Sequence, residues 1–488
     1  MSATLLHQSC SSRVAPPVKS SAVSGCSNRR VSSRCISRVF ANAAGTPEQL
    51  LEKASTTSDG RSFRRSLNKT GRYVRKPTND PDSLEMMEEH GVGYSKYGLV
   101  ARMRTMGNEF QYGDIRVKLA EAYGFCWGVE RAVQMAYEAR RAYPGKDIHV
   151  VNEIIHNPSV NGRLREMGFN IILEENGKDF SAVKPGDVIV LPAFGATLQE
   201  MKYLNDMGCQ LVDTTCPWVS KVWNAVDNQS RKQFTSIIHG KYAHEETKAT
   251  ASFATNYLIV KNMDEANYVC RYILEGGDRA EFMDKFKYAM SEGFDPDTML
   301  EAVGIANQTT MLKGETEAVG KLFEKTMMQK YGPAELPQHY MVMDTICDAT
   351  QERQDAMQLL VGQQDSPSER LDLMIVVGGF NSSNTSQLQH MAEEKGIPSF
   401  WVDGPHRIDP AANNVSHRLY THEMRETPGW LPEGPLTIGI TSGASTPDSV
   451  VEAVLDQVFR TRDPRYKGIE RLREAVATGV AHEDHEEI

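Results

Sequence analysis

Residues 209–220 have the sequence CQLVDTTCPWVS, in which a short apolar run is followed by Asp-Thr-Thr-Cys and then by a proline. Proline favours the first turn of a helix, so the segment predicts a strand, a polar turn and a helix start at the second cysteine. Two more segments follow the same plan, GFCWGVERA at 124–132 and MDTICDATQ at 343–351. Each of the three segments therefore places a cysteine where a strand gives way to a helix.

Apolar, β-branched runs alternate with helical stretches on both sides of these segments. The clearest helical stretch is VERAVQMAYEARR at 129–141. The other strand-like runs lie at 114–120, 147–155, 187–195, 234–240, 340–347, 373–379 and 436–443. The alternation predicts an α/β fold with mostly parallel strands, in which ligands bind beyond the carboxyl ends of the strands.

A second polar turn follows each cysteine segment, and the repeated order predicts three related α/β domains. These turns are IIHNPSV at 154–160, HGKYAHEET at 239–247 and GGFNSSNTS at 378–386. Three such domains around an axis would bring the three cysteines to one point. The predicted parts are a transit peptide (1–44), an N-terminal extension (45–113), domains at 114–215, 216–345 with an insertion at 263–300, and 346–465, and an acidic tail (466–488).

Length and composition exclude several classes of protein. The chain has 488 residues and a formal net charge of -10, with 54 basic and 64 acidic residues. We therefore expect neither nucleic acid nor an anionic membrane as the main partner. No apolar run approaches the roughly 18 residues of a membrane helix, and eight cysteines are too few for a disulfide scaffold, which predicts a soluble globular protein.

The first forty residues differ in composition from the rest. Residues 1–40 are rich in serine, hold six basic residues and contain no aspartate or glutamate. They also lack the apolar core of a secretory signal, so they predict an organellar transit peptide, with chloroplast favoured over mitochondrion. Cleavage near Ala41 to Ala44 would leave five cysteines in the mature chain.

Three of those five cysteines, Cys126, Cys216 and Cys347, are candidate metal ligands because a helix N-terminus favours the thiolate. Cys209 and Cys270 lack any motif and are predicted to be ordinary buried residues. Three ligands from distant segments, without a CxxC pair, indicate a metal centre with one open position. Spacing alone leaves two options, a 4Fe-4S cluster or a zinc ion.

The polar motifs indicate a small, strongly anionic ligand. Hydroxyls, an amide and backbone N–H groups gather at predicted helix starts, a common way to bind anions. No GxxxxGK[ST] loop is present, which argues against a nucleoside triphosphate. The candidate donors are His156, His244, Asn381, Ser382, Ser383, Asn384 and Ser445. Glu246, expected in a turn rather than on a helix, is a candidate proton donor, and Gln308, Thr309 and Thr310 form a further polar cluster.

Taken together, these motifs resemble the 4-hydroxy-3-methylbut-2-enyl diphosphate reductase family over roughly residues 114–460. No single motif is specific, but their joint order is. The matching strings are GFCWGVERA, NEIIHNPSV, DTTCPWVSKV, YAHEET, NQTT, DTICDATQERQ, NSSNTSQL and TSGASTPDSV. The resemblance implies an oxidoreductase that removes an allylic hydroxyl in the last step of the non-mevalonate isoprenoid route, giving isopentenyl and dimethylallyl diphosphate.

The resemblance also implies a trefoil of α/β domains around a 4Fe-4S cluster, and a role for each candidate residue. Cys126, Cys216 and Cys347 would hold the cluster, whose fourth iron would meet the substrate oxygen. Glu246 would donate the proton, and Thr309 would join the hydrogen bonds to that oxygen. The diphosphate would be held by His156, His244, Ser382, Ser383, Asn384 and Ser445.

The chain departs from many bacterial members of the family at three places. Phe194 stands in the turn AFGAT where those members carry a histidine, so one phosphate contact is missing. Residues 45–113 and the insertion at 263–300 resemble the plastid and cyanobacterial branch, in agreement with a transit peptide and a location in the chloroplast stroma. We therefore expect a ferredoxin as electron donor, while a homodimer is one option for the oligomeric state.

The segment at 60–76 is the expected docking place for that donor. It carries seven basic residues and no acidic one, and it lies in an otherwise acidic chain. These residues are Arg61, Arg64, Arg65, Lys69, Arg72, Arg75 and Lys76.

Two rival functions are compatible with the residues alone. A zinc hydrolase could use His239, His244 and Glu246, with the three cysteines as a separate structural site. A non-catalytic iron-sulfur carrier would account for the cysteines but not for the anion-binding turns.

Overall fold

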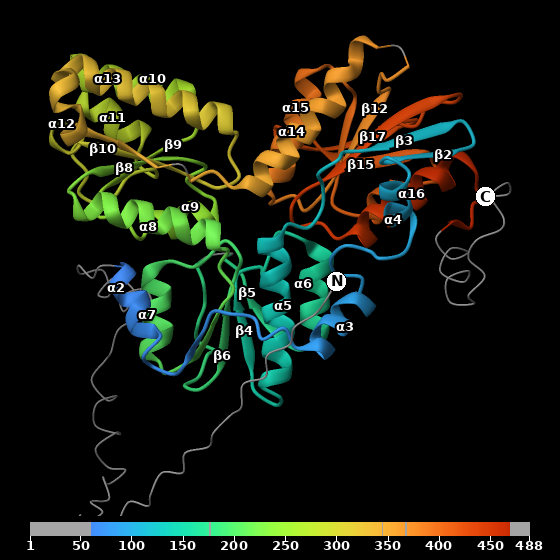
Figure 1. The fold of residues 1–488 in the computed structure, drawn as a ribbon, viewed down its shortest axis with the longest axis horizontal. Coiled ribbons are helices and arrows are strands. Elements are labelled where there is room, and N and C mark those ends of the chain that lie inside the picture. Colours follow the sequence, from blue (N-terminus) through green and yellow to red (C-terminus); the bar gives the residue numbers. More distant parts are fainter. Residues whose placement is uncertain (1–59, 175–176, 344, 367, 469–488) are drawn as a thin grey trace, which may run out of the picture. The chain divides into compact units, whose positions relative to one another are not determined.

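The computed structural model describes residues 60–174, 177–343, 345–366 and 368–468, all within one compact unit, Pro47–Ile488. The predicted transit peptide lies outside the described residues, as does the tail beyond residue 468. Three β-sheets, with helices against them, make up the described part (Figure 1). Most strand pairs are parallel, so the predicted α/β class is confirmed.

The first sheet has the strand order β1-β7-β6-β4-β5, and all its pairs are parallel. Its strands are β1 (Tyr73–Val74), β4 (Ile148–Val151), β5 (Phe169–Ile172), β6 (Val188–Leu191) and β7 (Gln210–Asp213). The neighbouring helices in the sequence are α5 (Trp127–Ala142), α6 (Pro158–Glu166) and α7 (Leu198–Asp206). Every residue of β4 and β6 is buried, as expected for parallel strands covered on both faces.

The second sheet has the order β11-β10-β8-β9 and is also parallel throughout. Its strands are β8 (Thr235–His239), β9 (Tyr257–Val260), β10 (Val303–Asn307) and β11 (Tyr340–Val342). Its helices are α8 (Pro217–Arg231), α9 (Glu245–Ala251), α10 (Met263–Glu275), α11 (Arg279–Lys285), α12 (Pro296–Met299) and α13 (Lys313–His339). The predicted insertion at 263–300 forms α10 to α12 and buries Phe282, Phe286 and Phe294 in the core, so it is an integral part of this layer.

The third sheet has the order β14-β15-β13-β12-β17-β3-β2, with β16 paired to β15. Parallel strands form its centre, and antiparallel strands complete both edges. Its strands are β2 (Glu109–Tyr112), β3 (Ile115–Leu119), β12 (Leu373–Val377), β13 (Ser399–Val402), β14 (Ile408–Asp409), β15 (Asn414–Arg418), β16 (Met424–Pro428) and β17 (Leu436–Ser442). Its helical elements are α4 (Leu99–Thr105), α14 (Asp348–Gly362), η3 (Gln363–Asp365), α15 (Ser383–Glu394), η4 (Pro405–Arg407) and α16 (Asp448–Arg462).

Strand β3 opens the predicted domain at 114–215 yet lies in the third sheet, parallel to β17. The chain then crosses through Cys126 and α5 to reach the first sheet. An apolar run shows that a strand is buried, but it does not show which sheet the strand joins. The boundaries of the three domains stay a prediction.

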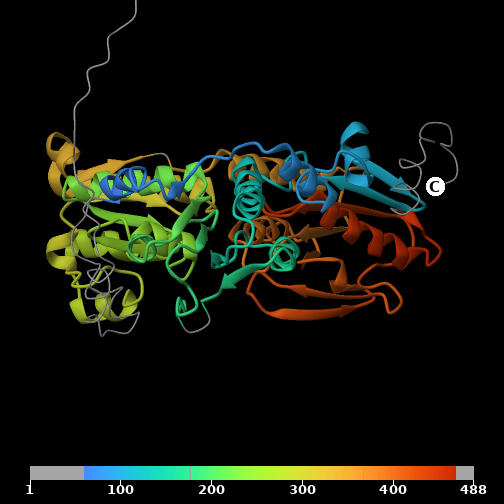
Figure 2. The same cartoon turned by 90° about the horizontal axis from the view of Figure 1, so that it is seen from below.

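The N-terminal extension is part of the fold from residue 60 onward. It forms α2 (Gly60–Leu67), β1, α3 (Pro81–Glu89), α4 and β2. Its first part, drawn in blue from α2 onward, runs alongside the green part of the chain (Figures 1 and 2). The Arg64 guanidinium carbon lies 5.2 Å from the ring centres of Trp223 and Phe253, while Nη2 donates to Asn224 at 2.7 Å. Arg64 is therefore a packing residue and not part of an exposed basic patch.

Among the described residues, none of the helices combines the length and the apolar character that crossing a bilayer requires.

Candidate active site

The three cysteines of the repeated motif are each the N-cap residue of a helix. Cys126 precedes α5, Cys216 precedes α8 and Cys347 precedes α14. These helices have 16, 15 and 15 residues, so each directs a full set of unpaired N–H groups and the positive end of its dipole toward a sulfur. The predicted strand-to-helix position is thus observed for all three cysteines.

The three thiols line one cavity of about 110 Å³, to which loops of all three sheets contribute. Gly128, in the first turn of α5, makes their approach possible. A Cβ atom on this glycine would lie 2.5 Å from Cys216 Sγ and 4.0 Å from Cys126 Sγ. The missing side chain therefore leaves the room in which two of the sulfur atoms meet.

The buried thiols hold their protons tightly in the absence of a positive group. Burial raises the pKa of Cys216 to about 12, the Cys126 sulfur adds to this, and the backbone N–H groups of Trp218 and Val219 act in the opposite direction. Burial also raises the pKa of Cys347. A cationic centre among the three sulfurs would reverse this balance, because metal binding deprotonates thiols.

The distances between the thiols bear on the kind of metal. Three sulfurs on one zinc ion, at about 2.3 Å each, must lie roughly 4 Å apart. Among the described residues, the ligand atoms of only one acidic or metal-binding trio all lie within 4.8 Å of one another, and that trio is His156, His244 and Glu245. At least one pair of the three cysteine sulfurs is therefore more than 4.8 Å apart.

Glu246 and Thr309 form a buried pair in the same cavity. The Thr309 amide donates to Glu246 Oε1 at 2.6 Å, and Thr309 Oγ1 donates to Oε2 at 3.0 Å. Burial raises the pKa of Glu246 to about 7, while both Thr309 contacts lower it. A carboxyl with this pKa can hold and deliver a proton near neutral pH.

Two histidines lie beside this pair. His244 is the N-cap of α9, and its Nδ1 accepts from the Glu246 amide at 3.2 Å. Nδ1 is therefore unprotonated, so Nε2 carries the proton of the neutral ring. Burial, followed by the nearby His156, lowers the pKa of His244 well below its usual value, which keeps the ring neutral.

His156 is held between an aromatic ring and a carboxylate. Its ring stacks on Phe194 with centres 4.7 Å apart and planes 8° apart, and Nδ1 lies 3.0 Å from Glu153 Oε2. Its Nε2 atom is buried without a hydrogen-bond partner. Phe194 thus contributes stacking and not a polar contact.

Four more predicted residues come from the third sheet. Ser382 is the N-cap of α15, and its hydroxyl accepts from the Thr385 amide. The Ser383 hydroxyl and the Asn384 side-chain nitrogen are buried and unpartnered, although Asn384 Oδ1 accepts from the Ala444 amide at 3.0 Å. Ser445 donates to the His156 carbonyl at 3.1 Å.

Asn381, one of the candidate donors, is exposed and does not line the cavity. Eleven other predicted site residues do line it, while their roles stay predictions. These residues are Cys126, Cys216, Cys347, Glu246, Thr309, His156, His244, Ser382, Ser383, Asn384 and Ser445.

Two details of the sequence interpretation were wrong. Glu246 is the second residue of helix α9 and not a turn residue, because His244 caps the helix two residues earlier. His239 does not line the cavity: its Nδ1 lies 2.8 Å from Thr316 Oγ1, so the proposed zinc trio of His239, His244 and Glu246 is not assembled.

Sequence reasoning missed several residues that shape the site. Gly128, Glu153 and two buried arginines, Arg131 and Arg353, were not singled out. Gly128 and Arg131 lie inside the quoted motif around Cys126, but the motif gave no sign that a glycine was needed for space or that an arginine reached another loop. Only spatial proximity could reveal this.

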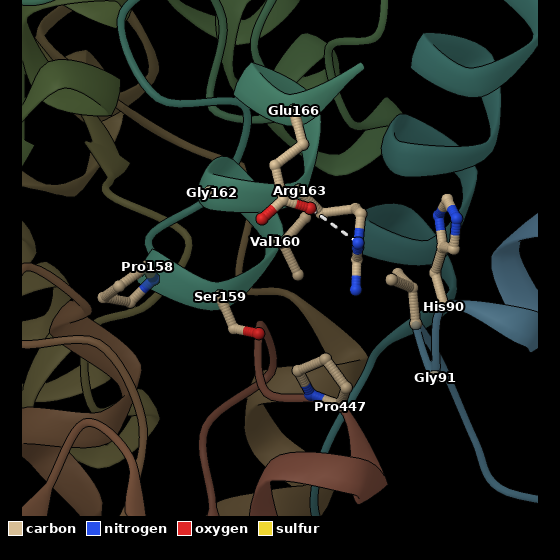
Figure 3. Close-up of a pocket in the computed structure, with 10 residues that line it drawn as sticks. His90, Gly91, Pro158, Ser159, Val160, Gly162, Arg163, Glu166 and Pro447 are labelled. Atoms are coloured by element: carbon tan, nitrogen blue, oxygen red, sulfur yellow. Dashed lines mark hydrogen bonds and ion pairs between the residues drawn. The ribbon is translucent and has the colours of Figure 1, made fainter. Parts of the chain in front are cut away.

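A second cavity lies apart from the thiols, between α6, the turn after α3 and Pro447 (Figure 3). Its lining includes His90, Ser159 and Arg163, and Arg163 is paired with Glu166 at 2.5 Å. It contains no cysteine and none of the predicted site residues.

The fold and the site define a class of α/β proteins in which three helix-capping cysteines from distant segments meet at a polar, buried cavity. Residues 117–459 match the family model described as LytB protein, and the chain belongs to this family. The match spans all the strand-to-helix turns that build the cavity.

Two curated relatives have high identity to the chain. One, from Botryococcus braunii, is named 4-hydroxy-3-methylbut-2-enyl diphosphate reductase, chloroplastic, and is 64% identical over 429 residues, which cover 87% of this chain and 86% of the relative. The other, from Thermosynechococcus vestitus, bears the same enzyme name without the chloroplast term and is 57% identical over 405 residues, which cover 83% of this chain and 98% of the relative.

A solved structure supports the fold. It is the E-1-hydroxy-2-methyl-but-2-enyl-4-diphosphate reductase from Plasmodium falciparum, with 20% identity and a TM-score of 0.52, and the match covers 75% of this chain and 98% of that one.

We expect replacement of Cys126, Cys216 or Cys347 by serine to abolish metal binding, because a centre with three protein ligands has none to spare. The check is iron content and visible absorbance of anaerobically purified protein. Cys209→Ser and Cys270→Ser are the matched controls and should retain both. A Cys209 variant that loses the metal while a Cys216 variant keeps it would contradict the ligand assignment.

Gly128→Ala should also reduce the iron bound per chain, since the new methyl group would overlap Cys216 Sγ. Gly162→Ala is the control, because this helical glycine has no atom within 4 Å of an added Cβ. Equal iron content in both variants would mean that the space beside Gly128 is not needed.

Proposed function

We propose that the chain removes the hydroxyl group of (E)-4-hydroxy-3-methylbut-2-enyl diphosphate reductively, to give isopentenyl diphosphate and dimethylallyl diphosphate. This is the last step of the non-mevalonate, or methylerythritol phosphate, isoprenoid route. One observation carries the proposal: three convergent thiols, a protonatable carboxyl and unpartnered hydrogen-bond groups line one cavity. The names of the curated relatives support it.

Cys126, Cys216 and Cys347 would hold one 4Fe-4S cluster per chain. The spread of the three sulfurs supports a cluster over a zinc ion, and so does the absence of His239 from the cavity lining. When bound, such a cluster supplies single electrons and an open iron that polarises the substrate's carbon–oxygen bond.

The unpartnered groups at the third sheet are suited to the diphosphate. A buried polar group without a partner costs roughly 1–3 kcal/mol, so the Ser383 hydroxyl and the Asn384 amide gain most from an anionic ligand. Both lie at the N-terminus of α15, whose dipole favours negative charge. Ser382 and Ser445 can add hydroxyl donors after rotation.

The lining of the cavity, as described, contains no lysine or arginine, so hydroxyls, an amide and the two histidine rings would hold the diphosphate. His156 Nδ1 lies 3.0 Å from Glu153 Oε2, and its Nε2 lies 3.8 Å from Glu245 Oε2. His244 would donate to a phosphate oxygen from Nε2 as a neutral ring.

Glu246 would deliver the proton that turns the hydroxyl into water. The overall reaction consumes two electrons and two protons: the carbon–oxygen bond breaks, oxygen leaves as water, and a carbon–hydrogen bond forms. Thr309 holds both oxygens of Glu246 and so fixes the direction of the carboxyl. Most residues that line the cavity are buried, which limits the access of bulk water to the reactive allylic group.

The electron donor would be a ferredoxin, and the chain would work in the chloroplast stroma after loss of residues 1–44. Fewer basic residues of the predicted docking segment at 60–76 are available to a partner than the sequence suggests. Arg64 is buried, and Arg75 contacts Ser220 and Asp213. Its exposed cations are Arg61, Arg65, Lys69 and Lys76. The Arg75 contacts bring this segment close to the loop before Cys216, which supports docking there.

The test of the function is turnover of the allylic diphosphate by anaerobic, iron-loaded protein with a low-potential chemical reductant. Both isopentenyl and dimethylallyl diphosphate should appear, with two electrons consumed per product. Protein that holds iron and accepts electrons but converts no substrate would instead be an iron-sulfur carrier.

Glu246→Gln should keep the cluster and bind substrate but lose about 10² to 10⁴-fold in turnover, the usual contribution of a general acid. Because the acid must be protonated and its pKa is raised to about 7, wild-type turnover should fall as pH rises above about 7. Glu317→Gln, at an exposed site on α13, is the control. Near-normal turnover of Glu246→Gln would place the proton source elsewhere.

Reversing the charges of Arg65, Lys69 and Lys76 to glutamate should slow reduction by ferredoxin and weaken its salt dependence, since salt screens steering by complementary charge. Turnover with the chemical reductant should not change. Reversal of Lys321, Lys325 and Lys330, exposed on α13, is the matched control. Equal losses with both reductants would mean that the segment supports the fold and does not recruit the donor.

A further inference from the structure

Arg353 connects the helix after one cysteine to the loop before another. It lies on α14, which Cys347 caps, and only 3% of the residue is exposed. Its Nη2 donates to the carbonyls of Gly124 at 2.6 Å, Phe125 at 3.0 Å and Tyr123 at 3.3 Å, and its Nε donates to Gly124 at 3.1 Å. The guanidinium thus binds the three carbonyls that immediately precede Cys126.

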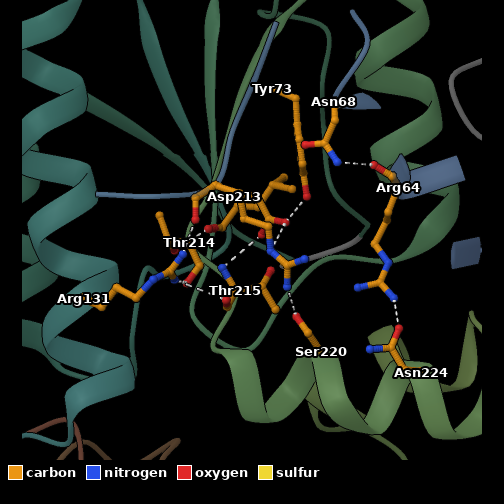
Figure 4. A network of polar contacts seen from close by, with 11 residues as sticks. Arg64, Asn68, Tyr73, Arg131, Asp213, Thr214, Thr215, Ser220 and Asn224 are labelled. Atoms are coloured by element: carbon orange, nitrogen blue, oxygen red, sulfur yellow. Dashed lines mark hydrogen bonds and ion pairs between the residues drawn. The ribbon is translucent and has the colours of Figure 1, made fainter. Parts of the chain in front are cut away.

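Arg131 makes a similar connection, between the helix that follows Cys126 and the loop that precedes Cys216. It lies on α5, which Cys126 caps, and is 8% exposed. Its Nη1 donates to the carbonyls of Thr214 at 3.2 Å and Thr215 at 3.4 Å, the two residues before Cys216 (Figure 4). Its Nη2 donates to the carbonyl of Arg75 from the N-terminal segment.

The loop before Cys216 receives further support from that segment. Asp213 is fully buried; its Oδ1 accepts from the Thr215 amide at 3.0 Å, and its Oδ2 accepts from the Tyr73 hydroxyl and lies 3.7 Å from Arg75 Nε (Figure 4). The third cysteine loop is tied without an arginine, by a hydrogen bond from Thr345 to Asn307 at the end of β10.

Neither arginine forms a direct ion pair. Among the described residues, no carboxylate oxygen lies within 4.0 Å of the side-chain nitrogens of Arg131 or Arg353. Burial lowers the pKa of Arg131, while the nearby Asp213, and less strongly the Cys216 sulfur, act in the opposite direction. A buried cation that is hydrogen-bonded mainly to carbonyls is costly, so an anionic centre among the sulfurs would offset part of that cost.

We propose that Arg131 and Arg353 are positioning residues that link the three cysteine loops into one unit and balance the negative charge of the bound centre. The inference rests on the proposed function, because it assumes that the thiols hold a cluster. The two buried charges would fix the loops that carry the Cys216 and Cys126 ligands, and their positive charge would favour the reduced state of the bound cluster.

The experiment compares anaerobic full-length wild-type protein with Arg131→Gln, Arg353→Gln and the corresponding lysine variants. Arg141→Gln is the matched control, an arginine three turns further along α5 whose side chain pairs with Asp80 and Asp82 at the surface. Iron per chain, the rate of cluster loss to a chelator and the midpoint potential of the cluster are measured, together with thermal unfolding of the iron-free proteins.

Both glutamine variants should lose the cluster about 10- to 100-fold faster than wild type, the usual effect of removing an outer-shell partner. Their midpoint potentials should move to more negative values, because a positive charge that favours the reduced cluster is gone. Lysine keeps the charge but reaches fewer carbonyls, so it should restore the potential while cluster loss stays fast. Arg141→Gln should match wild type in all three measurements.

Two results would overturn the proposal, and they are distinguishable from failure of the proposed function. Glutamine variants with wild-type potentials and cluster lifetimes would show that the arginines do not act on the centre. A loss of iron that only follows a lower thermal midpoint of the iron-free protein, with an unchanged potential, would reduce them to fold-stabilising residues. Wild-type protein that binds no cluster would instead refute the proposed function itself.

Discussion

The convergence of three thiols from distant parts of the chain on one cavity is the constraint on which the rest of the described fold depends. Each cysteine caps a helix of about four turns, so each sulfur sits at the positive end of a dipole and at the carboxyl end of a strand region. Gly128 leaves the space for the approach. The helices pack on the sheets, and each helix holds one cysteine at its N-terminus. The positions of the three sulfur atoms therefore depend on packing far from the cavity.

Burial sets the protonation of several groups in the cavity. It raises the pKa of Glu246 to about 7, raises the pKa of Cys216 and of Cys347, and keeps His244 neutral. Arg131 and Arg353 are also buried, and neither forms a direct ion pair with a described residue. Buried polar and charged groups are costly when they stand alone. The proposed metal centre and anionic substrate would offset part of this cost, which is consistent with the proposed reductive chemistry.

Local sequence patterns were sufficient to predict the α/β class, and they singled out residues that the fold brings to one cavity, whose roles stay predictions. Apolar runs such as 187–195 and 436–443 are typical of parallel strands that are buried on both faces. Polar residues that directly follow such strands lie at the carboxyl edge of the sheet, where ligands bind. The resemblance to a family then grouped the eleven residues. The structure corrected details that depend on one or two residues, such as the start of α9 at Glu245.

Other features could not be predicted because they depend on long-range packing. Nothing in the run 114–120 shows that β3 pairs with β17, more than 300 residues away. The basic segment at 60–76 has the composition of a surface patch, yet Arg64 lies over two aromatic rings. The hydrogen bonds from Arg353 to the Gly124 carbonyl could likewise not be predicted from a sequence motif, since an arginine in a helix is usually a surface residue.

The most direct test of the central claim is the iron, labile sulfide and zinc content of the anaerobically purified wild-type chain. The account predicts about four irons and four sulfides per chain and no zinc, as expected for a cluster held by three cysteines. One zinc ion per chain without sulfide would contradict it, because the three thiols would then serve a single metal ion.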